Sequence, residues 1–284
     1  MPPTQRLQGI QAKIDWAKQH IGTLEQAIKT FRTSDPYGFK IENDPKSGDK
    51  IHIIQIRQQT PANFPLIIGD AIHNLRSALD YLAWQLVLAN GQQPKSGRGG
   101  TQFPTLNTKG KSGQGDIQGI STRAQTLVDA VQPYQGSDDD LWTLHQLDIT
   151  DKHKLLIVTA FALNEIMPTW KVSNTGNYLR AVITSLKPVN GVLDFNLEVT
   201  DPKAQKFNIF VPVGVQDDGA LPIIDDGTAV ARLIAPLFPE ARFDLSFEIT
   251  INEPSIVAGK PIVPLLNRLA NHVNSIITQF ASHL

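Results

Sequence analysis

The chain of 284 residues carries 26 basic and 27 acidic side chains and no cysteine. The balanced charge argues against a surface that binds polyanions over its whole area. The missing thiols exclude disulfides, thiolate nucleophiles, iron–sulfur clusters and cysteine-ligated zinc. The N-terminal residues lack the apolar segment of a signal peptide, and the longest apolar run, residues 155–163, is far shorter than the roughly 20 residues of a membrane helix. We therefore expect a soluble cytoplasmic protein that has no membrane partner.

A long first helix is predicted between residues 4 and 33, because apolar residues recur there in steps of three and four, as in a coiled-coil heptad. These residues are Leu7, Ile10, Ile14, Ala17, Ile21, Leu24, Ile28 and Phe31. So long an apolar stripe favours a second copy of the chain as its cover, and we expect a possible homodimer.

A β-hairpin and three further helices follow in the first half of the chain. The hairpin strands are expected at residues 37–43 and 49–58, around a turn that contains proline and glycine. The second helix should begin near Asn63 and end near Asn90. After a glycine-rich loop at 91–119, a short helix is predicted at 121–132. Ser137 is a good N-cap for the fourth helix, whose first turn holds three aspartates that complement the helix dipole.

The apolar pattern changes from helical to alternating at about residue 155. Residues 192–199 and 243–251 alternate strictly between apolar and polar, and residues 178–187 and 206–213 are further strand candidates. A last heptad seam from Leu266 to Phe280 returns the chain to helix. We therefore predict a single α+β domain over residues 1–284, with a helical part at 1–154 and 261–284 and a β-rich part at 155–255. The C-terminal helix should rejoin the N-terminal bundle, with an antiparallel sheet inserted before it.

The second helix carries a polar stripe beside its leucine seam. His73, Arg76 and Asp80 share this stripe with Trp84, and Arg76 and Asp80 are spaced to form an ion pair. The helix lacks the lysines and glutamates that are typical of a solvated face. A plain solvated face with ordinary ion pairs is the alternative interpretation.

The fourth helix places acidic residues where its seam should be apolar. Continuing the spacing of Leu141 and Leu144 leads to Asp148 and Asp151, so two carboxylates enter the seam if the helix extends that far. A buried carboxylate must be paired, bound to a metal or protonated. The residues available as partners are His73 and Arg76 of the second helix and Lys152 and His153 of the fourth.

Three chemical roles are open to such a cluster. Asp148, Asp151 and one or two histidines could hold a divalent ion, with magnesium, manganese, calcium and zinc as candidates. Alternatively, His73 or His153 could be a general base that an aspartate orients, with Arg76 and Asp80 beside it and the guanidinium stabilising an oxyanion or phosphate. A third role is the binding of an anionic ligand without catalysis. The zinc-protease motif HExxH, the nucleophile motif GxSxG and a complete P-loop are all absent from the sequence.

Four segments of the chain resemble a group of uncharacterised bacterial proteins. They are Gly69-Asp70-x-x-His73-Asn74-Leu75-Arg76-Ser77-x-Leu79-Asp80, Gln102-Phe103-Pro104, Gln132-Pro133-Tyr134 and Asp151-Lys152-His153-Lys154. The helices also bear a loose likeness to HEPN domains, helical bundles that include ribonucleases of toxin and phage-defence systems. The HEPN signature places a histidine four to six residues after an arginine and a polar residue. Here the nearest pair, Arg268 and His272, has three intervening residues.

Three hypotheses follow from these patterns. The first is a hydrolase of a polar or anionic small substrate, with His73, Arg76, Asp80 and His153 as catalytic residues and Asp148 and Asp151 as ligands of an optional divalent ion. The second, implied by the likeness to HEPN domains, is a protein that acts on RNA. In it, the basic residues of the glycine-rich loop, Lys95, Arg98, Lys109 and Lys111, would contact the nucleic acid. The third is a non-enzymatic, oligomeric protein in which the charges fix the register of the helices.

Overall fold

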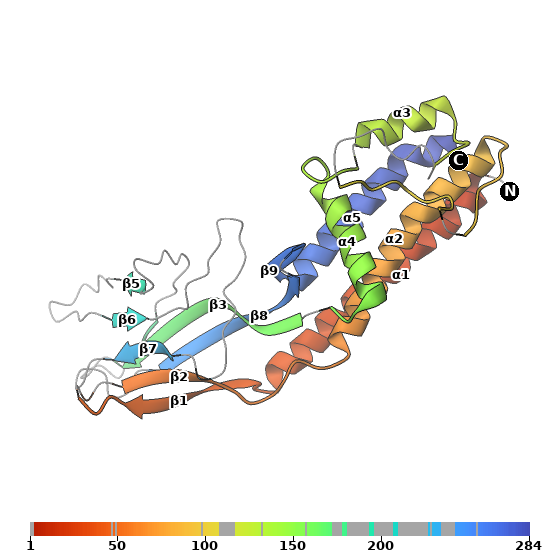
Figure 1. The fold of residues 1–284 in the computed structure, drawn as a ribbon. Coiled ribbons are helices and arrows are strands. Elements are labelled where there is room, and N and C mark those ends of the chain that lie inside the picture. The colour runs from red at the N-terminus through yellow and green to blue at the C-terminus, as the bar shows by residue number, and fades with distance from the viewer. Residues whose placement is uncertain are drawn as a thin grey trace.

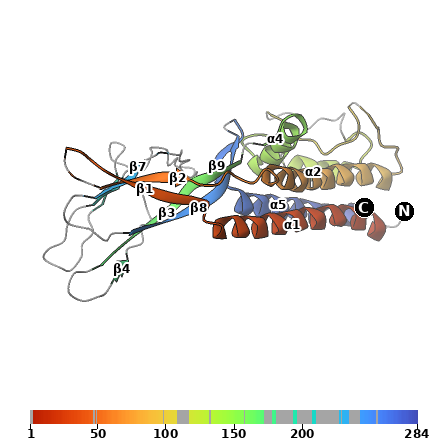
Figure 2. The same ribbon diagram turned by 90° about the horizontal axis from the view of Figure 1, so that it is seen from below.

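The computed structural model describes residues 3–46, 48, 50–97, 99–107, 117–131, 133–156, 158–171, 178–180, 193–195, 207–209, 227, 229–233, 242–253 and 255–284. The helices lie at one end of the molecule and the strands at the other, and both chain termini lie at the far end of the helical part (Figures 1 and 2). The predicted α+β fold class is confirmed, with helices at both ends of the chain and strands between them. Within these described segments, no helix is long and apolar enough to cross a bilayer.

Helices α1 (Pro3–Thr33) and α2 (Phe64–Ala89) pack side by side along most of their length. They run antiparallel, because Phe31 near the end of α1 contacts Phe64 at the start of α2, with ring centroids 6.0 Å apart. The apolar seams predicted for both helices face the core. The α1 seam is covered within the chain by α2 and by the C-terminal helix, so it is not an open apolar stripe. The homodimer itself stays a prediction.

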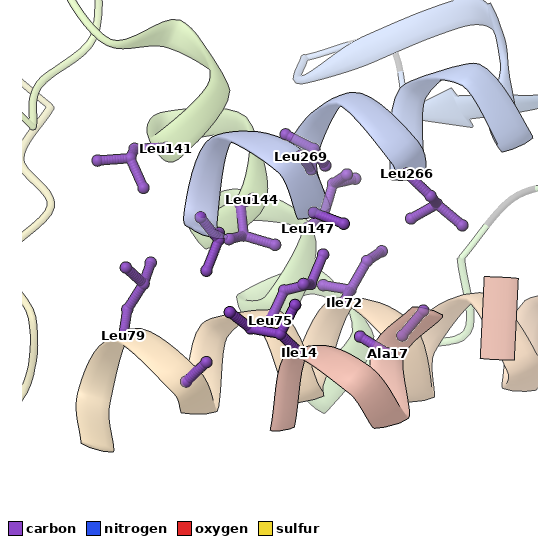
Figure 3. Packing of buried hydrophobic residues seen from close by; sticks show 14 of the residues in the cluster. Ile14, Ala17, Ile72, Leu75, Leu79, Leu141, Leu144, Leu147, Leu266 and Leu269 are labelled. Carbon is purple, nitrogen blue, oxygen red and sulfur yellow. The ribbon is translucent and has the colours of Figure 1, made fainter. Parts of the chain in front are cut away.

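Helices α4 (Asp139–His153) and α5 (Ile262–Phe280) complete the core. Figure 3 shows leucines of α4 and α5 meeting those of α2, so the C-terminal helix does rejoin the N-terminal bundle. The N-cap of α4 is Asp138, whose carboxylate accepts a hydrogen bond from the Leu141 N–H at 3.0 Å. The prediction of a Ser137 cap is wrong by one residue, because the carboxylate of Asp138 occupies that role. A shorter helix, α3 (Thr122–Val131), lies against α5. A 3₁₀ turn, η1 (Ala281–His283), follows α5 at the end of the chain.

The strands form two antiparallel sheets. Their bounds are β1 Tyr37–Asn43, β2 Lys50–Ile56, β3 Val158–Lys171, β4 Tyr178–Arg180, β5 Leu193–Phe195, β6 Phe207–Ile209, β7 Ala229–Leu233, β8 Arg242–Glu253 and β9 Val257–Pro261. One sheet has the order β1-β2-β7-β6-β5 and the other β4-β3-β8-β9. The hairpin β1–β2 does not stand apart, because β2 pairs with β7 from the second half of the chain. The remainder of the predicted strands, residues 181–187, 192, 196–199, 206 and 210–213, lies outside the described residues.

Strand β8 connects the β-rich part to the helical core. Ile249 and Ile251 belong to the same buried cluster as the helices. The Phe247 ring lies 4.2 Å from that of Tyr37, measured between centroids. The next residue, Glu248, pairs with Arg32 of α1 at 2.6 Å. These contacts anchor the strands to the end of the α1–α2 pair.

Candidate functional site

The candidate site lies where the polar stripe of α2 meets α4. Helix α4 turns Leu141, Leu144 and Leu147 toward the core, and the same face carries Asp148, whose exposed fraction is 2%. A carboxylate thus occupies a core position, as the seam spacing predicts. Its charge is retained inside the protein only because partners surround it.

Two side chains, His73 and Lys152, share the buried carboxylate of Asp148. Nδ1 of His73 lies 3.2 Å from one oxygen, and Nζ of Lys152 lies 2.5 Å from the other. His73 comes from α2 and is separated from Asp148 by 75 positions in sequence, whereas Lys152 is one turn further along α4. The Lys152 and His73 side chains remain about half exposed, at 51% and 53%. The structure therefore brings together a buried acid and an accessible imidazole.

The second ring nitrogen of His73 faces a hydroxyl group. Nε2 lies 3.4 Å from Oγ of Ser77, which is one helical turn further along α2. An ionised carboxylate only accepts hydrogen bonds, so the proton of a neutral ring belongs on Nδ1, and Nε2 is then an acceptor for the Ser77 hydroxyl. The three side chains form the series carboxylate, imidazole, hydroxyl.

Arg76 and Asp80 form a separate ion pair that holds a loop against α2. Nη2 of Arg76 donates to Asp80 at 2.8 Å and to the carbonyl oxygen of Phe103 at 2.6 Å, and Nη1 donates to the Thr105 hydroxyl at 3.2 Å. The N–H of Phe103 donates back to Asp80 at 2.9 Å. Arg76 is 3% exposed, so its guanidinium is used in fastening the segment around Phe103. Burial raises the pKa of Asp80, against the opposing effects of Arg76 and the Phe103 N–H.

Asp151 lies against Gly69 of α2 and beside the other acids. A Cβ atom at position 69 would come within 2.5 Å of both Asp151 oxygens, so glycine is what permits this approach. Burial raises the pKa of Asp151, and the nearby charges of Asp148 and Asp70 raise it further, while His73 opposes them.

His153 is not bonded to the other predicted site residues that the structure describes. Its side chain is exposed in the last turn of α4, and it makes no hydrogen bond or ion pair with the residues that the structure describes. The structure therefore places five of the six predicted site residues in or next to the α2–α4 contact and leaves His153 on the surface.

The two aspartates expected as metal ligands have other polar groups around them at this contact. The two oxygens of Asp148 already accept from His73 and Lys152. Across the described part of the chain, no three histidine, aspartate or glutamate side chains gather closely enough to hold a metal. A divalent ion held by Asp148 and Asp151 stays a prediction.

Three further polar residues near the site were not identified from the sequence. The first is Ser77, which the i, i+4 spacing from His73 could have indicated. The second is His145 of α4, whose Nδ1 is buried and has no hydrogen-bond partner among the described residues. Burial, with a smaller effect of Arg76, lowers the pKa of His145 to about 4, so this ring is neutral at physiological pH.

The third is Lys13, which reaches α2 from α1. Its Nζ donates to Oδ1 of Asn74 at 3.2 Å and lies 5.6 Å from the centroid of the Tyr81 ring. No single-helix pattern could have indicated this contact, because it depends on the register between α1 and α2.

The described residues connected with the RNA hypothesis lie outside the α2–α4 contact. Arg268 and His272 of α5 pair with carboxylates at the start of α4, namely Asp140 at 3.0 Å and Asp138 at 2.7 Å. In the glycine-rich loop, Lys95 donates to Gln118 at 2.6 Å. The other basic residues of that loop, at positions 98, 109 and 111, lie outside the described residues.

Comparisons with known proteins returned no relative of this chain. No family model matches it, and neither the curated proteins nor the solved structures contain a match. The function must therefore be inferred from the geometry of the α2–α4 contact.

Proposed function

We propose that the protein is a hydrolase of a small polar or anionic substrate, with His73 as its general base and Asp148 as the residue that orients it. The observation that carries this proposal is the placement of the two nitrogens of one ring. Nδ1 is held by a carboxylate that is 2% exposed, while Nε2 faces the Ser77 hydroxyl and belongs to a side chain that is about half exposed. A general base needs both an orienting partner and access to the reacting proton.

The exposure of His73 distinguishes this arrangement from a purely structural ion pair. Asp148 already has Lys152 as a partner at 2.5 Å, so a histidine is not required to neutralise it. The contrast with Arg76 on the same helix supports this interpretation. Arg76 is 3% exposed and bonded to the loop at Phe103 and Thr105, as a residue that fixes packing should be.

The charges around His73 favour a substrate with negative or strongly polar groups. The ammonium group of Lys152 is about half exposed beside Asp148, and Lys13 supplies a second ammonium group at the neighbouring Asn74. Cations at such positions attract anions and stabilise charge that develops in a transition state.

The proposal is tested with a panel of chromogenic esters, amides and phosphate esters. For any substrate that the wild-type protein hydrolyses, His73→Ala should lower kcat at least 100-fold, since general acid–base catalysis contributes roughly 10²- to 10⁴-fold. Asp148→Asn should lower kcat as well, because the amide no longer favours the Nδ1–H form of the ring. His283→Ala in η1, remote from this contact, is the control and should keep the wild-type rate.

Circular dichroism and thermal unfolding of each variant separate a loss of chemistry from a loss of folding. A folded His73→Ala protein that retains the wild-type kcat would overturn the proposal. Failure of the wild-type protein to hydrolyse any member of the panel would also count against it.

A further inference from the structure

We propose that Ser77 is the nucleophile of this site and that the substrate class is a carboxylic ester, hydrolysed through an acyl group carried on the serine oxygen. This inference rests on the proposed role of His73 as general base. It goes further in assigning a covalent step and a substrate class.

The first support is the direction of the Ser77 hydroxyl. Helical serines and threonines commonly donate to the carbonyl one turn earlier. Threonines elsewhere in this chain do so, namely Thr23, Thr30, Thr126 and Thr278. Ser77 instead directs its Oγ to Nε2 of His73, and this is its one side-chain hydrogen bond within the described residues. The hydroxyl is thus held by the imidazole rather than by the helix backbone.

The second support is the connected series of distances. Asp148 to Nδ1 is 3.2 Å and Nε2 to Oγ is 3.4 Å. A nucleophile and its base usually lie about 2.6–3.2 Å apart and are often further apart without substrate. An acid, a base and a hydroxyl in this order is the arrangement that activates serine in unrelated hydrolases.

The third support is a cation on the stripe of α2 that carries the serine. Asn74, Ser77 and Tyr81 follow one stripe of α2, because they are spaced by three and four residues. Lys13 contacts Asn74 at 3.2 Å and lies 5.6 Å from the centroid of the Tyr81 ring, so its ammonium group contacts the residues on either side of Ser77 in this stripe. A positive charge at this place suits the oxyanion that forms when an ester carbonyl is attacked.

The proposed reaction has two steps, acylation of Ser77 and hydrolysis of the acyl-serine. In the first, Oγ of Ser77 bonds to the ester carbonyl carbon, its proton passes to Nε2 of His73, and the carbonyl oxygen becomes an oxyanion facing Lys13. Collapse of this species breaks the bond to the alcohol, which leaves with the proton from His73. In the second, water attacks the acyl-serine with proton transfer to His73, and the carboxylic acid departs as Ser77 regains its proton. Asp148 keeps the charged ring oriented throughout.

The experiment uses a fluorophosphonate probe, which reacts with activated serines with loss of fluoride, and mass spectrometry of the intact protein and its peptides. We expect one adduct on Ser77 in the wild-type protein, no adduct in Ser77→Ala, and labelling at least 100-fold slower in His73→Ala. Ser275→Ala, which removes an exposed helical serine of α5, is the matched control and should label normally. Lys13→Met should slow ester turnover about 100-fold, the loss typical of one oxyanion donor.

The outcomes separate this inference from the proposed function. If ester hydrolysis is lost in His73→Ala but retained in Ser77→Ala, and no adduct forms, His73 activates water directly and the covalent inference is overturned. If labelling and hydrolysis persist in both variants, both proposals are overturned. If Lys13→Met keeps the wild-type turnover, the role assigned to Lys13 is overturned. A Ser77 adduct that depends on His73 supports the inference.

Discussion

Replacing Arg76 by methionine tests whether this residue fastens the loop at Phe103 rather than taking part in chemistry. Methionine keeps a long side chain at the position but removes the charge and the donors. The substitution leaves the Phe103 carbonyl without its 2.6 Å donor and removes the 2.8 Å partner of Asp80. Asp80 would retain the Phe103 N–H, and its side chain is about one third exposed.

The structure indicates that Arg76→Met lowers the free energy of unfolding by an amount near the lower end of the range for broken buried ion pairs. Removing one partner of a buried pair costs about 3–5 kcal/mol, and a hydrogen bond to a charged group contributes about 1.5–3 kcal/mol. Water can reach Asp80 in part, so we expect Arg76→Met to lower the free energy of unfolding by about 3 kcal/mol. Asp80→Asn keeps an oxygen that accepts from both Arg76 and Phe103, and should cost only about 1 kcal/mol.

Urea unfolding followed by far-ultraviolet circular dichroism measures both values, and Asp80→Asn is the matched comparison. If Arg76→Met costs less than about 1 kcal/mol, or no more than Asp80→Asn, the guanidinium does not hold the loop in the way the contacts indicate. Protease cleavage near Phe103 should also become faster in Arg76→Met, because the loop loses the donors that Arg76 supplies to Phe103 and Thr105.

Three further substitutions test other contacts of the bundle. In an Asp151→Ala background, Gly69→Ala should raise the free energy of unfolding by roughly 1 kcal/mol through helix propensity. In the wild-type protein the gain should be clearly smaller, because the new Cβ meets the Asp151 oxygens. Equal gains in urea unfolding would exclude that contact. The hydrogen bond from His272 to Asp138 raises the pKa of that histidine, so its stabilising contribution is complete below pH 6.5 and is lost as the pH rises through the raised value. His272→Gln should therefore cost more at pH 6 than at pH 9, and a pH-independent cost in thermal unfolding would contradict this. Leu144→Ala empties a core position that is 1% exposed and should cost about 2–5 kcal/mol in urea unfolding, whereas a cost below 1 kcal/mol would contradict its place in the core.

The helices and the buried acid were predictable because their signals are local. Apolar spacing in steps of three and four depends only on the helical period, so the seams of α1, α2 and α5 could be identified along the sequence. The same spacing indicated that Asp148 would face inward, and it does. For Asp151 the spacing was a weaker guide, because this side chain near the end of α4 is only partly covered.

Contacts between segments that are distant in sequence could not be predicted from local patterns. Strand β7 carries no strong alternation, and its pairing with β2 depends on how the two halves of the chain meet. The attachment of Arg76 to Phe103 depends on a loop whose path is set by packing rather than by composition. The N-cap of α4 differed by one residue, since Ser137 and Asp138 are both good caps and the surrounding contacts, including His272, favour the aspartate.

The sequence by itself determined the helical and alternating segments and the acidic position in the seam of α4, because hydrophobic period and helix geometry act over a few residues. Only the tertiary structure decided which imidazole meets that acid. His73 and Asp148 are 75 positions apart, and their approach requires α2 and α4 to pack in one register. The same packing gives His73 and Arg76 different roles. The His73 ring remains open to solvent, whereas the Arg76 guanidinium, one turn further along α2, is buried against a loop. Burial and partner choice are properties of the assembled core, and no single segment encodes them.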